Sequence, residues 1–499
     1  MGMTKDSNTV NAMDIAKTIE LLLQYAERCG LIAGLDIVLS RNLLMDLLRI
    51  SAPFEDETVR NDSHNHLKLD DMLPPIFEYA YKQGIIESDS IESCDLFEAK
   101  IMGLLTPRQS EVIGIFNTIK ETQGIKAAAD YFYKLSTDTN YIKTERIKKN
   151  LYWTHTTAFG ELQITVNLSK PEKDPRDIAK ALKAAHTAYP KCLLCVENVG
   201  FAGHYNHPAR QNHRIIPIKL GGEDWYFQYS PYSYFNEHGI PLRAKHTPIH
   251  IGRGTFERLV DFLEIFPHYF VGGNAGLPIV GGSILNHDHF QSGLHTFPIQ
   301  SAAVIQSYWI GANNSTGLVE SSSNDATHGV RADILRWPMS VIRLTSESRD
   351  KIIDAASLIL EKWQGYSDMS VEIAAFSGDM PHNAITPIAR INPDGAFEFD
   401  LVLRNSRTSE AFPDGIFHPH PHVHHIKKEN IGLIEVMGLA ILPGRLAAQV
   451  THAANRQQEE AYIGDIFLEV LSHAGVFKMN DEGVAAFKRF MDYCGAVSE

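Results

Sequence analysis

The stretch GGSILNHDHFQ at positions 281–291 constrains the fold and the chemistry of this protein more than any other part of its sequence. Its glycine pair is typical of a turn, and the residues after the turn favour an extended strand. Side chains two positions apart lie on the same face of a strand. If the segment is extended, His287, His289 and Gln291 therefore form one row on one surface.

Such a row suits nucleotidyl transfer. A neutral imidazole is a good nucleophile at neutral pH, and a phosphoryl-imidazole readily passes its group onward. The Gln291 amide can donate a hydrogen bond to a phosphate oxygen but cannot protonate a leaving group. Gly281, Gly282 and Ser283 can add backbone N–H groups and a hydroxyl. An isolated His-x-His is more often a pair of structural histidines, but the upstream glycines and the glutamine in phase favour the chemical interpretation.

Length and composition indicate a globular chain with more than one folding unit. The chain has 499 residues, 44% of them hydrophobic and 21% charged, so it is neither mainly disordered nor fibrous. Its 46 Lys and Arg against 60 Asp and Glu give a net charge of −14. This charge argues against nucleic acid as a partner, because duplex binding needs a positive field.

The cysteines and the N-terminal sequence predict a cytoplasmic protein. Five cysteines, an odd number, favour a reducing compartment and no disulfides. The chain begins MGMTKDSNTVNAMD, without the basic and apolar regions of a signal peptide. Its apolar runs are shorter than the roughly 18 residues that span a membrane. We therefore expect no membrane partner.

The periodicity of apolar residues divides the chain into thirds. Residues 1–150 show helical spacing and predict a mostly helical N-terminal region. Residues 151–330 contain short alternating runs typical of strands, with helices expected at 174–188 and 255–266. Residues 331–499 return to the same mixture of strands and helices. The predicted fold class is α+β.

A polar segment at 311–329 predicts a linker between the second and third of these regions. After it come a strand, a helix, a hairpin with an Asn-Pro-Asp-Gly turn at 392–395, a His-rich strand and a helix. This order broadly repeats that of the middle third. It indicates a duplicated α+β unit.

Cys192 and Cys195 form a Cys-x-x-Cys pair. Two thiolates at this spacing are half of a tetrahedral zinc site, and His246 and His287 can complete a set of two cysteines and two histidines. A redox pair and a coincidence are the alternatives.

A dense run of histidines occupies residues 418–425 (HPHPHVHH). The two prolines predict an extended loop, followed by a strand from His422 in which His422 and His424 share a face. With His382 these histidines are candidates for a metal site. The alternatives are a polar edge, or a partly ordered loop that picks up transition metals adventitiously.

Two stretches of the chain resemble the galactose-1-phosphate uridylyltransferases, specifically their longer bacterial class, type 2. They are residues 270–293 (FVGGNAGLPIVGGSILNHDHFQSG) and 424–446 (HHIKKENIGLIEVMGLAILPGRL). Residues 207–217, 226–238 and 381–390 add to the similarity. The resemblance implies duplicated histidine-triad-like domains after the helical region, at 151–330 and 331–499, with a mainly antiparallel sheet and helices.

It also implies a role in galactose metabolism and a ping-pong reaction. UDP-glucose uridylylates a histidine, glucose 1-phosphate leaves, and galactose 1-phosphate takes the UMP to give UDP-galactose. Members of the family are usually homodimers in which the partner subunit contacts the sugar phosphate. The segment 431–445 is therefore expected to act across an interface.

The family's functional residues match positions in this chain. The nucleophile and the phosphoryl-binding amide match His289 and Gln291. The ligands of the family's zinc ion match Cys192, Cys195, His246 and His287. Asn236 and Glu237 match the family's pair that binds uridine and ribose. Asn274 matches its active-site asparagine, and Ser283 matches the serine that contacts the phosphate.

The chain also departs from the shorter class of the family. Asp288 follows the first histidine where that class has proline. His382, His422 and His424 resemble the histidines of a second metal site, but no glutamate follows Gln291 at the place of the fourth ligand. The sequence therefore argues against a second metal.

Two other functions remain open at this point. Dinucleoside-polyphosphate phosphorylases also belong to the histidine-triad superfamily and can share His-x-His-x-Gln, but they would adenylylate the histidine. A zinc-stabilised binding protein would lose stability on metal removal without forming a covalent intermediate.

Overall fold

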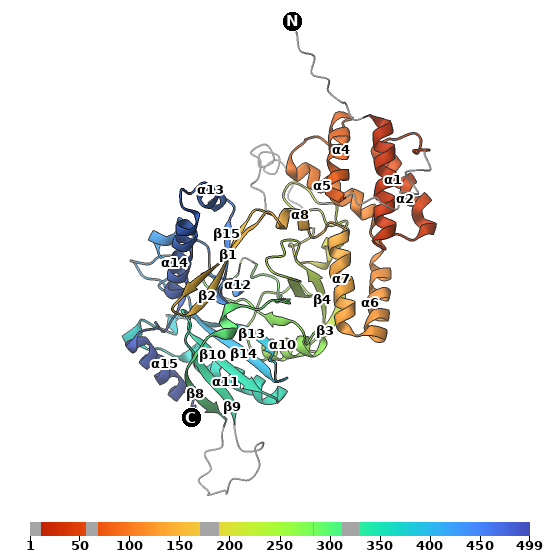
Figure 1. Cartoon of the computed structure of the whole chain (residues 1–499). Coiled ribbons are helices and arrows are strands. Elements are labelled where there is room, and N and C mark those ends of the chain that lie inside the picture. Colours follow the sequence, from red (N-terminus) through yellow and green to blue (C-terminus); the bar gives the residue numbers. More distant parts are fainter. Residues whose placement is uncertain (1–10, 56–67, 170–188, 283, 312–328) are drawn as a thin grey trace. The chain divides into compact units, whose positions relative to one another are not determined.

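The computed structural model describes residues 11–55, 68–169, 189–282, 284–311 and 329–499 (Figure 1). The chain divides into two compact units. Unit 1 comprises Met1–Lys148 and Ser169–Ile216, and unit 2 comprises Lys149–Leu168 and Pro217–Glu499. The helix expected at 174–188, Ser283 and nearly all of the expected linker lie outside the described residues.

Unit 1 is helical, as predicted for the N-terminal region. In α1 the N-cap is Asn11, whose side chain accepts hydrogen bonds from two backbone N–H groups of the first turn. Ile15, Ile19, Leu22 and Leu23 of α1 are buried, which is the spacing of one helix face. The helices are α1 (Ala12–Arg28), α2 (Ile37–Leu48), α4 (Leu69–Lys82), α5 (Ile91–Leu105), α6 (Gln109–Gln123), α7 (Ile125–Asp138) and α8 (Thr144–Ile147), with short 3-10 turns η1 (Gly34–Asp36) and η2 (Val196–Asn198).

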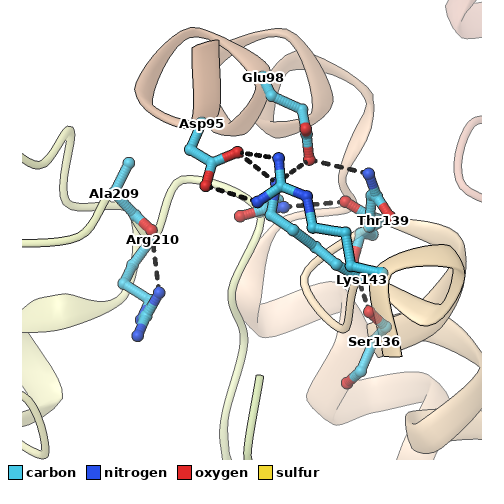
Figure 2. A network of polar contacts seen from close by, with 10 residues as sticks. Asp95, Glu98, Ser136, Thr139, Lys143, Ala209 and Arg210 are labelled. Atoms are coloured by element: carbon cyan, nitrogen blue, oxygen red, sulfur yellow. Dashed lines mark hydrogen bonds and ion pairs between the residues drawn. The ribbon is translucent and has the colours of Figure 1, made fainter. Parts of the chain in front are cut away.

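A network of charged side chains connects α5 to the chain that follows α7 (Figure 2). Arg146 on α8 donates two hydrogen bonds to the Asp95 carboxylate, at 2.6 and 2.8 Å. Lys143 donates to Asp95 at 3.0 Å and to Glu98 at 2.6 Å. Burial raises the pKa of Asp95, but the charges of Lys143 and Arg146 outweigh burial and hold it below its ordinary value. The network therefore fastens α5 to α8.

We predict that Asp95→Asn lowers the free energy of unfolding by about 1–3 kcal/mol, because it leaves two partly buried cations without their shared carboxylate. Asp130→Asn is the matched control. Asp130 pairs with Lys126 on the surface of α7, where such a pair contributes about 0.3–0.5 kcal/mol. Urea denaturation measures both variants, and equal losses would contradict a structural role for the network.

Unit 2 is built on a large, mainly antiparallel sheet. Among the described residues its strand order is β16-β8-β9-β10-β14-β13-β6-β7-β5-β4-β3. The strands are β3 (Ile216–Leu220), β4 (Glu223–Tyr229), β5 (Gly239–Arg243), β6 (Phe270–Gly272), β7 (Gln291–Gly293), β8 (Val304–Ile310), β9 (Val330–Leu335), β10 (Val341–Ser346), β13 (Asn383–Ile391), β14 (Phe397–Asn405) and β16 (Val497–Ser498).

The sheet shows the duplication that the element order suggested. In one half the chain makes β3, β4 and β5, then helix α10 (Arg253–Ile265), then β6 and β7, in the spatial order β3-β4-β5-β7-β6. In the other half it makes β8, β9 and β10, then helix α11 (Arg349–Gly365), then β13 and β14, in the order β8-β9-β10-β14-β13. The two halves join where β6 pairs with β13. The α+β fold class with duplicated units is therefore confirmed.

The turn predicted at 392–395 joins β13 to β14. The Asn392 side chain accepts hydrogen bonds from the N–H groups of Asp394 and Ala396, and Gly395 has a φ of +88°. A glycine adopts this φ without steric cost. The local sequence therefore sets the hairpin.

Helices and a second sheet complete unit 2. Helices α10 and α11 contact each other, and both contact β13 (Figure 1). A small sheet has the order β1-β2-β15. Its strands β1 (Leu151–Thr157), β2 (Gly160–Asn167) and β15 (Leu439–Pro443) share a buried apolar core with helix α14 (Arg456–Ala474) and the large sheet. The remaining regular structure described consists of short elements and one further helix. These are η3 (Pro298–Ser301), η4 (Met369–Val371), β11 (Phe376–Ser377), β12 (Met380–Pro381), η5 (Pro421–Val423), α12 (Leu433–Val436), α13 (Leu446–Thr451) and helix α15 (Asp481–Tyr493).

The strand predicted from His422 is wrong. Pro421–Val423 form the 3-10 turn η5, and no strand of the described chain includes His424. Two imidazoles bind backbone carbonyls of the loop: His420 contacts the oxygen of Ile416 at 3.2 Å, and His424 that of Pro419 at 2.8 Å. These local bonds, with the fixed φ of proline, favour a loop over a strand.

The division into three domains at 150 and 330 stays a prediction. Within the described residues, no helix is long and apolar enough to cross a membrane.

Candidate active site

The segment that contains His289 is held against β5 by backbone hydrogen bonds. The N–H of Phe290 donates to the oxygen of Pro241 at 2.8 Å, and the N–H of Arg243 donates to the oxygen of Asp288 at 3.0 Å. Phe290 is buried and its ring stacks on Trp225, with centroids 5.1 Å apart. Because successive side chains alternate, His289 and Gln291 lie on the opposite face from this stack.

His289 is a buried, neutral imidazole. Its Nδ1 lies 2.8 Å from the backbone oxygen of His287. A carbonyl oxygen can only accept, so Nδ1 carries the proton and Nε2 keeps a lone pair. Burial lowers the pKa of His289 to about 4. At neutral pH its Nε2 is therefore a nucleophile that needs no base to activate it.

Gln291 contacts a histidine that the sequence analysis did not single out. The Oε1 atom of Gln291 lies 3.2 Å from Nε2 of His238, the residue that precedes β5. Burial lowers the pKa of His238 to about 3, so it too is neutral. The sequence offered one signal for it, its place directly after Asn236 and Glu237.

His287 lies in a bend, so the strand alternation does not extend to it. Its Nε2 is 2.7 Å from the oxygen of Arg243 and therefore donates to it. The other nitrogen, Nδ1, then carries no proton. The His287 ring lies beside that of His246, with centroids 4.7 Å apart. Unit 2 thus brings together two of the predicted zinc ligands.

Unit 1 brings together the other two. Sγ of Cys192 lies 3.5 Å from Sγ of Cys195. The Asn198 amide donates to the backbone oxygens of both cysteines, at 2.8 Å each, and so holds the turn between them. Burial raises the pKa of the Cys195 thiol. None of the five cysteines, all within the described residues, forms a disulfide. Together these two pairs supply Cys and His groups that suit zinc.

Asn274 lies in the loop after β6 and is buried. Its Oδ1 accepts a hydrogen bond from the N–H of Leu433 at 3.0 Å. A Cβ atom on Gly282 would lie 2.6 Å from Nδ2 of Asn274, so any other residue there would have to displace the Asn274 amide. The segment 431–445, expected to act across an interface, thus contacts Asn274 of its own chain, and most of its apolar side chains are buried in unit 2.

Asn236 and Glu237 differ in their environment. Glu237 is buried, with a φ of +52°, and its carboxylate accepts a hydrogen bond from the hydroxyl of Tyr269. Tyr269 in turn lies 2.8 Å from the hydroxyl of Tyr229. Asn236 is exposed. No pattern in the sequence pointed to the tyrosine contact, which joins residues 32 positions apart.

The structure does not bring His382, His422 and His424 together as a metal site. Nε2 of His382 lies 2.8 Å from the Ser377 hydroxyl, and Nε2 of His424 binds a backbone oxygen. His422 instead contacts Glu469 at 2.6 Å. The reason is that 421–424 form a loop and not the predicted strand.

Two family models match the chain. Residues 55–248 match the model described as "Galactose-1-phosphate uridyl transferase, N-terminal domain", and residues 262–465 match its "C-terminal domain". Among curated proteins, the galactose-1-phosphate uridylyltransferase of Caldanaerobacter subterraneus subsp. tengcongensis is 48% identical, covering 97% of this chain and 98% of the relative. Those of Bacillus subtilis (97% and 98% covered) and Halalkalibacterium halodurans (96% and 98%) are 46% and 45% identical. No solved structure matches the chain.

We predict that Gly282→Ala lowers the free energy of unfolding by about 1–3 kcal/mol. The new methyl group displaces the Asn274 amide and leaves the buried N–H of Leu433 without its acceptor. Gly365→Ala at the end of α11 is the control, because a Cβ there meets nothing within 4 Å. Urea denaturation compares the two variants. An unchanged free energy of unfolding for Gly282→Ala would contradict the prediction, because the loop would then accommodate the methyl group without cost.

Proposed function

The chain belongs to the galactose-1-phosphate uridylyltransferase family, and from this premise we propose that it is an enzyme that moves UMP from UDP-glucose to galactose 1-phosphate through a uridylyl-histidine at His289. One observation carries the assignment of the nucleophile. His289 is buried and neutral, with Nδ1–H bound to a backbone oxygen and the Nε2 lone pair left to react.

In the first half-reaction, Nε2 of His289 attacks the α-phosphorus of UDP-glucose. A phosphorus–nitrogen bond forms, the bond from the α-phosphorus to the bridging oxygen breaks, and glucose 1-phosphate leaves with the electron pair. The ring becomes positively charged, and the hydrogen bond from Nδ1–H to the His287 oxygen strengthens as that charge develops. In the second half-reaction, a phosphate oxygen of galactose 1-phosphate attacks phosphorus and the ring leaves neutral.

The leaving group needs no proton, since a phosphate monoester is stable as an anion. Gln291 suits this reaction because its amide can donate a hydrogen bond to a phosphoryl oxygen without being an acid. We assign Asn274, Gly282 and Ser283 to the same phosphates. The exposed amide of Asn236 and the held carboxylate of Glu237 are assigned to uridine and its ribose.

We also propose that Cys192, Cys195, His246 and His287 bind one structural zinc ion. Two thiolates and two imidazoles are a usual ligand set for such a site. Within each unit the two ligands are already close, and the donation from His287 Nε2 to a carbonyl orients that ring for a metal at Nδ1. Bound zinc would keep the thiols deprotonated and steady the segment that leads into His289.

The resemblance further supports a homodimer and a place in galactose metabolism. None of the five described cysteines forms a disulfide, which supports the cytoplasm, where thiols stay reduced.

We expect UDP-glucose labelled at the α-phosphorus to leave acid-labile label on the protein. His289→Ala should take up none, because it lacks the attacking nitrogen. His250→Ala is the matched control and should label normally, since His250 is an exposed histidine of the same unit. Label taken from ADP-glucose, also labelled at its α-phosphorus, in place of UDP-glucose would instead indicate a dinucleoside-polyphosphate phosphorylase, because that enzyme would adenylylate the histidine. Label on His289→Ala would refute the assignment of the nucleophile.

For the metal, we expect zinc in protein washed with a weak chelator, and Cys192→Ser should lose most of it because one thiolate ligand is gone. Cys94→Ser, also in unit 1, should keep its zinc. Elemental analysis by mass spectrometry gives the content of each variant. Equal zinc in the two variants would discard the site.

A further inference from the structure

We propose that His238 is a positioning residue that fixes the orientation of the Gln291 amide, so that its NH2 group and not its oxygen faces the phosphoryl group. This inference rests on the proposed function, because it assumes that Gln291 serves the uridylyl transfer. His238 touches neither the substrate nor the nucleophile in this scheme. It acts through Gln291.

Neighbouring strands bring the two side chains together. His238 immediately precedes β5 and Gln291 begins β7, and the two strands pair at Gly239 and Ser292. Nε2 of His238 then lies 3.2 Å from Oε1 of Gln291. A contact across paired strands leaves the glutamine few alternatives, since Gln291 pairs with Gly272 of β6 and the next residue, Ser292, pairs with Gly239 of β5.

The tautomer of His238 follows from its other nitrogen. Nδ1 is buried and has no hydrogen-bond partner among the described residues. A proton on Nδ1 would bury an unpaired donor and leave Nε2 as an acceptor. A proton on Nε2 makes the bond to Gln291 and leaves only a lone pair unpaired, which costs less. Nε2–H therefore donates to Oε1.

Packing holds the His238 ring in this position. It is 3% exposed, and its centroid lies 4.4 Å from that of Phe235 and 5.6 Å from that of Tyr234. Burial also keeps the ring neutral, since its pKa lies at about 3. The donor consequently adds no charge to the site.

An amide has an acceptor at one end and a donor at the other, and the wrong end would repel a phosphate. Once Oε1 accepts from His238, the NH2 group is the end that remains for the substrate. The bond also polarises the amide and makes NH2 a better donor as charge develops in the transition state. The effect should therefore appear in the rate of uridylylation and not in the binding of UDP-glucose.

The test compares His238→Met with His238→Gln. Both replacements are flexible and of similar size, but only Gln can donate to Oε1. His238→Phe is a third variant that keeps an aromatic ring beside Phe235. The readouts are the single-turnover rate of His289 uridylylation at saturating UDP-glucose and the concentration of UDP-glucose that gives half of that rate.

We expect His238→Met and His238→Phe to lower this rate by about 10- to 100-fold, somewhat less than the loss of a direct transition-state donor. The half-saturating concentration should stay within a factor of about three, and His238→Gln should restore most of the rate. In a Gln291→Met background, His238→Met should cost nothing further, because the group it positions is absent.

Equal rates for His238→Met and His238→Gln would overturn the inference. So would an undiminished effect of His238→Met in the Gln291→Met background, since the histidine would then act on the fold and not through Gln291. If His238→Phe does not fold, the comparison of the rates of His238→Met and His238→Gln still tests the inference. If the unaltered protein takes no label from UDP-glucose, the proposed function itself fails; if it labels and only the variants disagree, only this inference fails.

Discussion

The pairing of residues 288–290 with β5 is the constraint on which the site depends. Two backbone hydrogen bonds to Pro241 and Arg243 set the register of this segment. A shift by one residue would exchange the two faces, turning His289 toward Trp225 and placing Phe290 on the face that His289 now occupies. The stack of Phe290 on Trp225 opposes such a shift, because it buries two large aromatic rings. The core on one face thus positions the proposed nucleophile, His289, on the other.

Duplication gives the two halves of the sheet different tasks. Across the junction, Gln291 pairs with Gly272, Gly272 with Ile388, and Ile388 with Asp400. Asp400 therefore occupies the position in the second half that Gln291 occupies in the first. It is fully buried and accepts hydrogen bonds from Arg343, at 2.7 and 3.0 Å. One half presents the neutral side chains proposed for catalysis, whereas the other has a buried ion pair at the same position, and removing one partner of such a pair is strongly destabilising.

Neutral donors are a consistent feature of the site. The chain carries a net charge of −14, and the imidazoles of His238 and His289 are kept uncharged by burial. In the proposed reaction a neutral His289 attacks phosphorus, which a protonated ring could not do. The proposed recognition of the phosphates relies on amides and backbone N–H groups, which bind an anion without protonating the leaving group.

The sequence by itself determined the features that depend on near neighbours. These are the helical face of α1, the Asn392 turn, the Cys192–Cys195 pair and the placement of His289 and Gln291 on one face of the chain. Each is decided by residues a few positions apart, so its pattern is visible in the chain. The prediction of a strand from His422 is wrong, because imidazole contacts with the backbone stabilise a loop there. Only the tertiary structure decided the contacts of Gln291 with His238 and of Glu237 with Tyr269, which lie 53 and 32 residues apart. The reason is physical: strand order and register choose these partners, and both emerge only when the sheet and its core assemble.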